Sequence, residues 1–286
     1  MSPLDGRRVL ITGAARGIGA ATAQRLYSRG ARLALAGIEA DALAETAAKC
    51  GALAIPCDVR DRAQVEAAVA AAVEHLGGLD VVIANAGVGA QLPIVGGNPE
   101  IFERTIAVNL LGVYYTLRAA GPHISHERGY ALAISSLAAA VHPPLLGAYS
   151  ASKAGVEALG DALRIELRPS GARVGVAYFG ELDTEMTSRG FGTDAARLLQ
   201  AGFGAFSRVT PLEVGIDAIE RGIDRRSRRV VAPKYAAGLL PTRMAAQRVI
   251  ELAMRTRNLD RVLQVARDEH APLTTELPES EPGSNS

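Results

Sequence analysis

Short apolar runs alternate with longer stretches of helical periodicity along most of the chain. The apolar runs predict strands at residues 8–12, 32–37, 52–57, 80–84, 130–135, 173–178 and 229–232. The run Val81-Val82-Ile83-Ala84 is apolar at every position, as is typical of a strand covered by helices on both faces. Between the runs, apolar positions at helical spacing predict helices at residues 17–29, 40–49, 61–76, 99–120, 148–168 and 211–224. This alternation indicates an α/β fold, in which helices flank both faces of a doubly wound, seven-stranded parallel sheet.

The pattern also divides the chain into a main domain and a C-terminal extension. No linker rich in Pro, Gly or Ser interrupts residues 1–232, which we expect to form one domain. Within it, residues 180–208 are rich in glycine and show no clear period, so we expect a mobile lid over the substrate. Residues 233–270 return to a helical pattern, whose apolar stripe is formed by Leu240, Met244, Val249, Leu252, Leu259, Val262 and Ala266. Residues 271–286 are rich in Pro, Glu and Ser, and we expect them to be disordered.

Composition and charge indicate an ordinary globular protein. Of the 286 residues, 48% are hydrophobic, and 31 Lys and Arg nearly balance 30 Asp and Glu. This balance produces no global field that would attract nucleic acid, so we expect no such partner. Cys50 and Cys57 lack the spacing of a zinc site or a disulfide framework, which predicts no metal and a reducing, cytoplasmic setting. No stretch has the pattern of a signal peptide or a membrane span, in agreement with that location.

A glycine-rich turn follows the first predicted strand and opens the first predicted helix. It reads Thr12-Gly13-Ala14-Ala15-Arg16-Gly17-Ile18-Gly19. A helix N-terminus presents unpaired N–H groups, and glycines let a pyrophosphate approach the backbone. By position, Gly13 would form the turn, Gly17 the close approach and Gly19 the contact between helix and strand. Ala15, Arg16 and Ile18 would lie beside the cofactor, and a purely structural turn is the alternative interpretation.

Two further segments fall at the carboxyl ends of predicted strands, where ligands bind in open α/β sheets. Asp58-Val59 follows the third strand, and Asn85-Ala86-Gly87 follows the fourth. The carboxylate of Asp58 could accept a hydrogen bond from an adenine amine. Each segment alone also fits a turn or a helix cap. Their joint placement is what favours a dinucleotide site.

Tyr149 and Lys153 lie four residues apart, on one face of a predicted helix. An ammonium near a phenol favours the phenolate, so we expect Lys153 to lower the pKa of Tyr149 and prepare it for proton transfer. Thirteen residues before Tyr149, Ser136 follows the fifth predicted strand, where its hydroxyl would reach a substrate oxygen. Surface packing explains most Tyr and Lys pairs at this spacing, and Ser136 is the residue that favours catalysis.

In this order along the chain, the motifs resemble those of the short-chain dehydrogenase/reductase family. The resemblance covers residues 7–232 and rests on the cradle at 12–19, Asp58-Val59, Asn85-Ala86-Gly87, Asn109, Ser136 and Tyr149-x-x-x-Lys153. It implies a Rossmann fold and hydride transfer between NAD or NADP and a secondary alcohol, ketone or aldehyde. It also implies that Tyr149 is the general acid/base, that Ser136 orients the substrate oxygen and that Lys153 binds the nicotinamide ribose. Asn109 would hold a water of the proton relay.

The chain departs from the pattern of that family after the sixth predicted strand. Phe179 stands where the family usually has proline, before Gly180. Its ring would pack on the nicotinamide or on an apolar substrate, or it is simply a core residue. Thr184 keeps the place of the residue that would bond the nicotinamide carboxamide.

The choice between NAD and NADP rests on conflicting signals near the second predicted strand. Gly37 stands where an Asp would bond the adenosine ribose and select NAD. Arg16 would pair with the 2′-phosphate of NADP, whereas Glu39 would reach the ribose of NAD. The sequence therefore predicts NAD or NADP without choosing between them.

Mainly apolar residues surround the predicted reacting groups, so we expect a small apolar alcohol or carbonyl compound as substrate. They are Val88, Leu137, Ala138, Val141, Leu145, Leu146 and Phe179. The resemblance also implies a homodimer or homotetramer, paired through the helices at 99–120 and 148–168. The 233–270 extension would widen that interface, cover a neighbour's site or lie on a membrane surface, although most amphipathic helices pack on their own domain.

A second class of function stays open beside the enzyme. The chain could be a catalytically quiet dinucleotide-binding protein with a regulatory or scaffolding role. Ser136, Tyr149 and Lys153 together argue against that interpretation. A sugar-nucleotide epimerase or dehydratase fits less well, because the extension is too short for the larger C-terminal domain of those enzymes.

Overall fold

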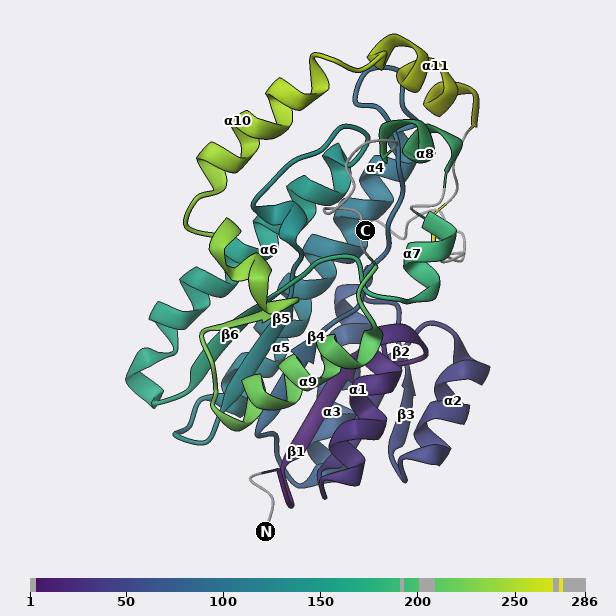
Figure 1. Ribbon diagram of the computed structural model, residues 1–286. Coiled ribbons are helices and arrows are strands. Elements are labelled where there is room, and N and C mark those ends of the chain that lie inside the picture. The colour runs from purple at the N-terminus through teal and green to yellow at the C-terminus, as the bar shows by residue number, and fades with distance from the viewer. Residues whose placement is uncertain (1–3, 191–192, 201–208, 270–272, 275–286) are drawn as a thin grey trace, which may run out of the picture.

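Seven parallel strands form one sheet in the order β3-β2-β1-β4-β5-β6-β7 (Figure 1). This computed structural model describes residues 4–190, 193–200, 209–269 and 273–274. The strands are β1 Arg8–Thr12, β2 Arg32–Gly37, β3 Leu53–Pro56, β4 Val81–Ala84, β5 Tyr130–Ile134, β6 Arg173–Phe179 and β7 Arg229–Ala232. The chain runs outward from β1 to β3 and then returns to β4 beside β1, so the strand order reverses between β1 and β4. The prediction of a doubly wound, seven-stranded parallel sheet is confirmed.

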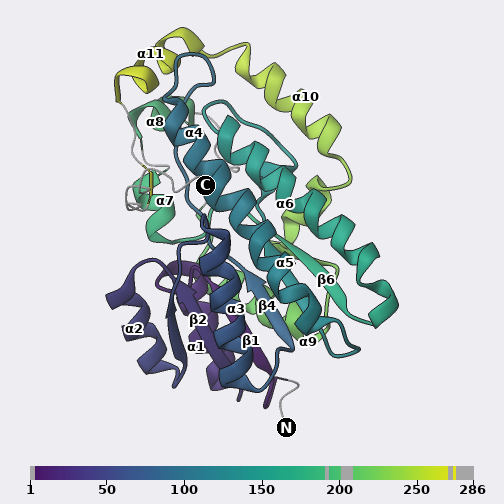
Figure 2. The ribbon, with the colours of Figure 1, turned by 180° about the vertical axis from the view of Figure 1, so that it is seen from behind.

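Helices cover both faces of the sheet (Figures 1 and 2). One layer holds α1 Gly17–Ser28, α2 Ala40–Lys49 and α9 Leu212–Asp224, and the other holds α3 Arg62–Leu76, α5 Gly112–Ile124 and α6 Gly147–Glu166. Val9 and Ile11 belong to the core under the first layer, and Leu10 to the core under the second, because alternate strand residues face opposite sides. Burial on both faces explains why the strands are apolar almost throughout.

The helix predicted at residues 99–120 is longer and irregular. It runs as α4 Pro99–Ile106, a π-helical turn Ala107–Leu111 and then α5 through Ile124. The π turn inserts an extra residue into the helix and contains Asn109. The other predicted helices and the strands differ from the observed elements by two residues at most at either end.

Residues 180–208, expected as a lid without regular structure, contain two short helices in their described part. These are α7 Glu185–Gly190 and α8 Asp194–Gln200. Residues 201–208 lie outside the described residues. The mobility of this segment stays a prediction.

The 233–270 extension forms a 3₁₀ helix, Lys234–Leu239, followed by α10 Arg243–Met254 and α11 Leu259–Glu269. The predicted single apolar stripe is wrong, because a turn after Met254 separates the two helices. Val262 and Ala266 of α11 are buried against Leu199 of α8, whereas Met244 and Leu252 of α10 are 81% and 57% exposed. The helix α10 thus lies along the outside of the molecule (Figure 1).

Two residues of the predicted disordered tail are described, and both pack on the domain. Thr274 N–H donates to Gly89 O at 3.0 Å, and Gly89 N–H donates to Thr274 Oγ1 at 2.9 Å. Leu273 packs beside Ala90 and Ala148. The rest of that tail, 271–272 and 275–286, lies outside the described residues. Within the described ranges, no helix has the length and apolar character needed to cross a membrane.

Candidate active site

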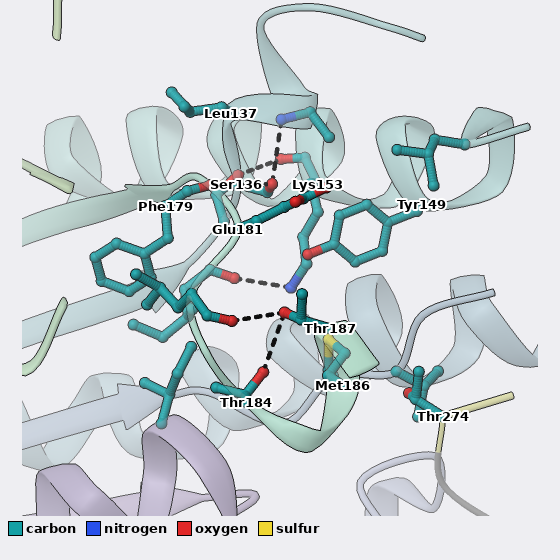
Figure 3. Close-up of a pocket in the computed structure, with 18 of the residues that line it drawn as sticks. Ser136, Leu137, Tyr149, Lys153, Phe179, Glu181, Thr184, Met186, Thr187 and Thr274 are labelled. Atoms are coloured by element: carbon teal, nitrogen blue, oxygen red, sulfur yellow. Dashed lines mark hydrogen bonds between the residues drawn. The ribbon is translucent and has the colours of Figure 1, made fainter. Parts of the chain in front are cut away.

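A cavity of about 960 Å³ opens above the carboxyl ends of the strands. The glycine turn after β1 lines one end of it, and Ser136, Tyr149 and Lys153 line the other. The cavity therefore lies over β1 and β4, where the strand order reverses, which is the usual ligand position in such sheets. Figure 3 shows the end that contains Ser136, Tyr149 and Lys153.

The glycine turn brings backbone from β1, α1 and the end of β4 into close contact. A Cβ at Gly19 would lie 2.2 Å from Gly13 O, and a Cβ at Gly13 would lie 2.6 Å from Ala86 Cα, so neither position has room for a side chain. Gly17 differs, because no atom lies within 4 Å of its Cβ position and its φ is 54°. This open space at the N-terminus of α1 would admit a pyrophosphate close to the backbone. The turn therefore fits NAD or NADP.

Asn85 and Asp58 have well-defined partners at the neighbouring strand ends. Asn85 Nδ2 donates to the backbone oxygens of Thr12 and Gly13, at 2.9 Å each, and so ties the turn to β4. The Asp58 carboxylate accepts from Arg60 Nε at 2.9 Å and from Arg60 Nη2 at 2.6 Å. The predicted contact with adenine would use a carboxylate that an arginine already holds.

Lys153 reaches the cavity because α6 is bonded to the end of β5. Ser135 Oγ donates to Lys153 O at 2.8 Å, and Lys153 Nζ donates to Ile134 O at 3.0 Å. The Lys153 side chain is almost fully buried, and its Nζ lies 5.6 Å from the centroid of the Tyr149 ring. The helix thus presents a phenol and an ammonium to the same space, one turn apart (Figure 3).

Ser136 lies just after the carboxyl end of β5, where two backbone groups hold its side chain. Its Oγ accepts from Ala138 N–H at 3.1 Å and donates to Phe179 O at 3.3 Å. The Ser136 side chain also forms a hydrogen bond with the phenol of Tyr149. The hydroxyls of Ser136 and Tyr149 therefore face one space, as two groups that bind a single substrate oxygen must do.

The expected lowering of the Tyr149 pKa by Lys153 is not what the structure shows. Burial raises the pKa of Tyr149, and the hydrogen bond with Ser136 opposes this rise only in part. Burial also lowers the pKa of Lys153 to about 8, and its Nζ is directed to Ile134 O. Removal from water thus disfavours the charged form of both groups.

Comparison with known proteins gives a consistent result. The family model described as short chain dehydrogenase matches residues 7–194. The chain belongs to the short-chain dehydrogenase family. It is therefore an NAD(P)-dependent oxidoreductase that acts on CH–OH groups.

Individual relatives cover different shares of the chain. It is 39% identical over 206 residues to a glycine betaine reductase of Emericella nidulans, a match that covers 70% of this chain but 16% of that protein. It is 36% identical over 197 residues to trans-4-hydroxycyclohexanecarboxylate dehydrogenase of Sinomonas cyclohexanicum, covering 64% of this chain and 76% of the relative. A short-chain dehydrogenase/reductase from Burkholderia phymatum, solved in complex with NAD, superimposes with a TM-score of 0.75 at 25% identity and covers 88% of this chain and 97% of its own.

The short-chain dehydrogenase fold brings nearly all the predicted site residues to the cavity. All of the predicted cofactor residues except Gly19 line it: Gly13, Ala15, Arg16, Gly17, Ile18, Gly37, Asp58, Val59, Asn85, Ala86, Gly87, Tyr149, Lys153, Gly180 and Thr184. The predicted substrate residues do so as well: Val88, Leu137, Ala138, Val141, Leu145, Leu146 and Phe179. Phe179 is 3% exposed and packs in the core beneath α9 while lining the cavity, so it combines the two alternatives.

Asn109 is the predicted catalytic residue that does not line the cavity of this dehydrogenase. Its side chain is buried, and Oδ1 accepts from Val88 N–H at 2.8 Å. Its Nδ2 donates to Val88 O at 2.9 Å and to Ser152 Oγ at 3.1 Å. The side-chain amide thus fixes the segment after β4 to α6. A water of the proton relay would have to bind elsewhere on this residue.

Several cavity residues could not be recognised from local sequence. Leu199 of α8, Ile250 and Ala253 of α10, and Thr274 form part of the wall. Each is far from the motifs along the chain, and none lies in a pattern that indicates a site. Glu181 also lines the cavity, and its only sequence signal is its position directly after Gly180, where the chain departs from the family pattern.

The lowered pKa of Lys153 predicts how stability changes with pH. Because the folded state releases this proton near pH 8 and the unfolded state near 10.5, the unfolded state binds more protons in between, and stability rises with pH across that window. Below pH 8 the cost of burying the charge is fully present. Between pH 7.5 and 9.5, the free energy of unfolding of the wild type should rise by about 2 kcal/mol relative to that of Lys153→Met. Chemical unfolding at each pH measures both values. A constant difference between the two proteins would contradict the shift.

Proposed function

We propose that the protein interconverts an alcohol and a ketone or aldehyde with Tyr149 as the acid and base. The observation that carries this is the position of Ser136, Tyr149 and Lys153 at one end of a single cavity whose other end is the glycine turn. NAD or NADP, when bound there, supplies or accepts the hydride. The chain's own residues then bind, orient and exchange the proton.

In the reducing direction, Tyr149 Oη donates its proton to the substrate oxygen. Ser136 Oγ donates a hydrogen bond to that oxygen in exchange for its present bond to Phe179 O. Burial keeps the Tyr149 phenol protonated near neutrality, which is the form that a general acid needs. In the oxidising direction Tyr149 must lose that proton, and Lys153, when charged, favours the phenolate.

We further propose that most of the substrate is apolar. The cavity that contains Ser136 and Tyr149 is also lined by an aliphatic and apolar set, which includes Leu137, Val141, Leu145 and Met186. An apolar body that displaces water from this wall gains about 25 cal/mol per Å² buried. Such a body suits the cavity better than a sugar or a polyanion.

Arg16 and Glu39, the two residues that gave conflicting signals for the cofactor, belong to one ion-pair cluster, and this cluster favours NAD. Arg16 Nε donates to Glu39 Oε2 at 2.6 Å, and Arg16 Nη1 donates to Glu185 Oε2 at 2.8 Å. Arg16 is thus shared by two carboxylates, so a 2′-phosphate would meet a net negative group. The ribose hydroxyl of NAD can instead donate to Glu39.

The preference for NADH should be about tenfold or more in kcat/KM over NADPH, because a phosphate beside a carboxylate is repelled. The Glu39→Gln variant should reduce that ratio by about tenfold, since it removes the repulsion and leaves Arg16 with one carboxylate. Glu45→Gln is the charge control, because Glu45 is exposed on the same side of the sheet and pairs with Lys49. Preference for NADPH in the wild type would contradict the assignment.

The experiment that tests the proposed function follows nicotinamide absorbance with a panel of apolar alcohols and ketones. Turnover that depends on Tyr149 supports the proposal. Cofactor binding without turnover of any member would favour the regulatory or scaffolding alternative. The homodimer or homotetramer, the cytoplasmic location and the single domain at 1–232 stay predictions beside it.

A further inference from the structure

Among the described residues, four acidic side chains line the cavity, and Glu181 differs from the other three. Glu39 and Glu185 are paired with Arg16, and Asp58 is paired with Arg60. Within the described residues, the Glu181 carboxylate accepts no hydrogen bond and forms no ion pair. A carboxylate in a cavity without a protein partner is available to a ligand.

The backbone holds Glu181 firmly in place. Gly180, the residue before Glu181, is fixed to the end of β7, because its N–H donates to Ala232 O at 2.9 Å. Thr210 N–H donates to Glu181 O at 2.8 Å, and Asp183 N–H donates to Thr210 O at 2.9 Å. The carboxylate is therefore carried on a segment bonded on both sides, and little ordering would be needed when a ligand binds.

The side chain extends from the end of β6 into the cavity, on the side of Ser136 and Tyr149 (Figure 3). Burial raises the pKa of its carboxyl group. The cavity that it lines is also lined by Leu137, Val141 and Leu145, so its charge is partly removed from water. A cation placed beside the carboxylate would replace the stabilising interaction with water that the carboxylate has lost.

We propose that Glu181 selects substrates that carry a protonated amine a few bonds from the reacting carbinol or carbonyl carbon. This inference rests on the proposed function, since it assigns the substrate class of the same site. The ammonium donates a charge-assisted hydrogen bond to Glu181 while the substrate oxygen lies between Ser136 and Tyr149. The remainder of the substrate, an apolar body, packs on Leu137, Val141 and Leu145.

This assignment sharpens the expectation of an apolar substrate. A neutral ketone would leave the Glu181 carboxylate desolvated and unpaired, which costs free energy on binding. An amino ketone satisfies the carboxylate and still covers the apolar wall. The site therefore favours amphiphilic amino ketones and amino alcohols over purely apolar ones.

The test compares two ketones of nearly equal shape, β-dimethylaminopropiophenone and its carbon isostere isopentyl phenyl ketone. With NADH in excess at pH 7, the wild type should reduce the amine with a kcat/KM about tenfold or more above that of the isostere. Glu181→Gln should lower kcat/KM for the amine by about tenfold and change it for the isostere by about twofold at most. Asp183→Asn is the matched control, because it removes a negative charge from an exposed position on the same segment.

The outcomes separate this inference from the proposed function. Equal rates for the two ketones in the wild type, or an equal loss for both in Glu181→Gln, would overturn the role of Glu181. A higher dissociation constant for NADH in Glu181→Gln, with the amine preference kept, would assign the carboxylate to the cofactor instead.

If neither ketone is reduced, the proposed function fails for this substrate class, and the role of Glu181 is then tested by calorimetry. Tighter binding of the amine to the enzyme with NADH would support the inference, and equal affinities would overturn it.

Discussion

The Tyr149→Phe variant should lose about a thousandfold in kcat, with the dissociation constant of NADH changed by about twofold at most. Phenylalanine keeps the ring and removes the phenolic proton that the proposed mechanism passes to the substrate oxygen. With substrate and cofactor in the cavity that the phenol lines, water would have little room to take its place. Steady-state rates and titration of NADH fluorescence measure the two quantities separately.

A matched change on the same helix distinguishes chemistry from structure. Ser150→Ala lies next to Tyr149, and its hydroxyl is buried without a hydrogen-bond partner in the described structure, so its removal should leave kcat close to that of the wild type. A Tyr149→Phe enzyme that kept more than a tenth of the wild-type kcat would remove Tyr149 from the role of acid and base.

The Gly19→Ala variant should weaken NADH binding by about 30-fold. A methyl group at this position would lie 2.2 Å from Gly13 O and 2.9 Å from Ala14 Cα, and both atoms belong to backbone that cannot rotate away. Forcing such an atom into a packed site costs about 2 kcal/mol, which corresponds to that change in the dissociation constant. The turn would have to shift, and with it the N–H groups that would face a bound pyrophosphate.

Gly238→Ala provides the control for this substitution. Gly238 is exposed, and no atom lies within 4 Å of its Cβ position. Both variants are compared by NADH titration and by thermal unfolding. Unchanged NADH affinity in a folded Gly19→Ala protein would show that the contact between Gly19 and Gly13 does not shape the cofactor site.

The part of the fold that local sequence could predict is the part in which each element carries its own signal. Apolar runs such as Val81-Val82-Ile83-Ala84 become central strands because they are buried on both faces. The turn at 12–19 and the Tyr149 and Lys153 pair are short-range patterns, so their place at the cavity followed from strand and helix assignment alone. The same patterns could not show that burial raises the pKa of Tyr149, because burial depends on the whole fold.

The rest of the site depends on contacts between distant parts of the chain. Thr274 reaches the cavity through its two hydrogen bonds with Gly89, 185 residues earlier in the chain. Met244 is exposed and Val262 is buried because a turn separates α10 from α11, and the hydrophobic pattern of residues 233–270 did not predict this turn. Arg16 and Glu39 were each recognised, but only the structure shows that they bind each other.

The cavity wall has a consequence for how this enzyme could change. The cradle and the reacting groups lie within residues 7–194, which the family shares, whereas Leu199, Ile250, Ala253 and Thr274 lie beyond that stretch. Substitutions in α8, α10 and the segment at Thr274 can therefore reshape the recognised molecule without disturbing the machinery of hydride transfer. For a protein engineer, these four positions are the place to build a library, and they are also where natural divergence of substrate could accumulate while the reaction itself stays the same.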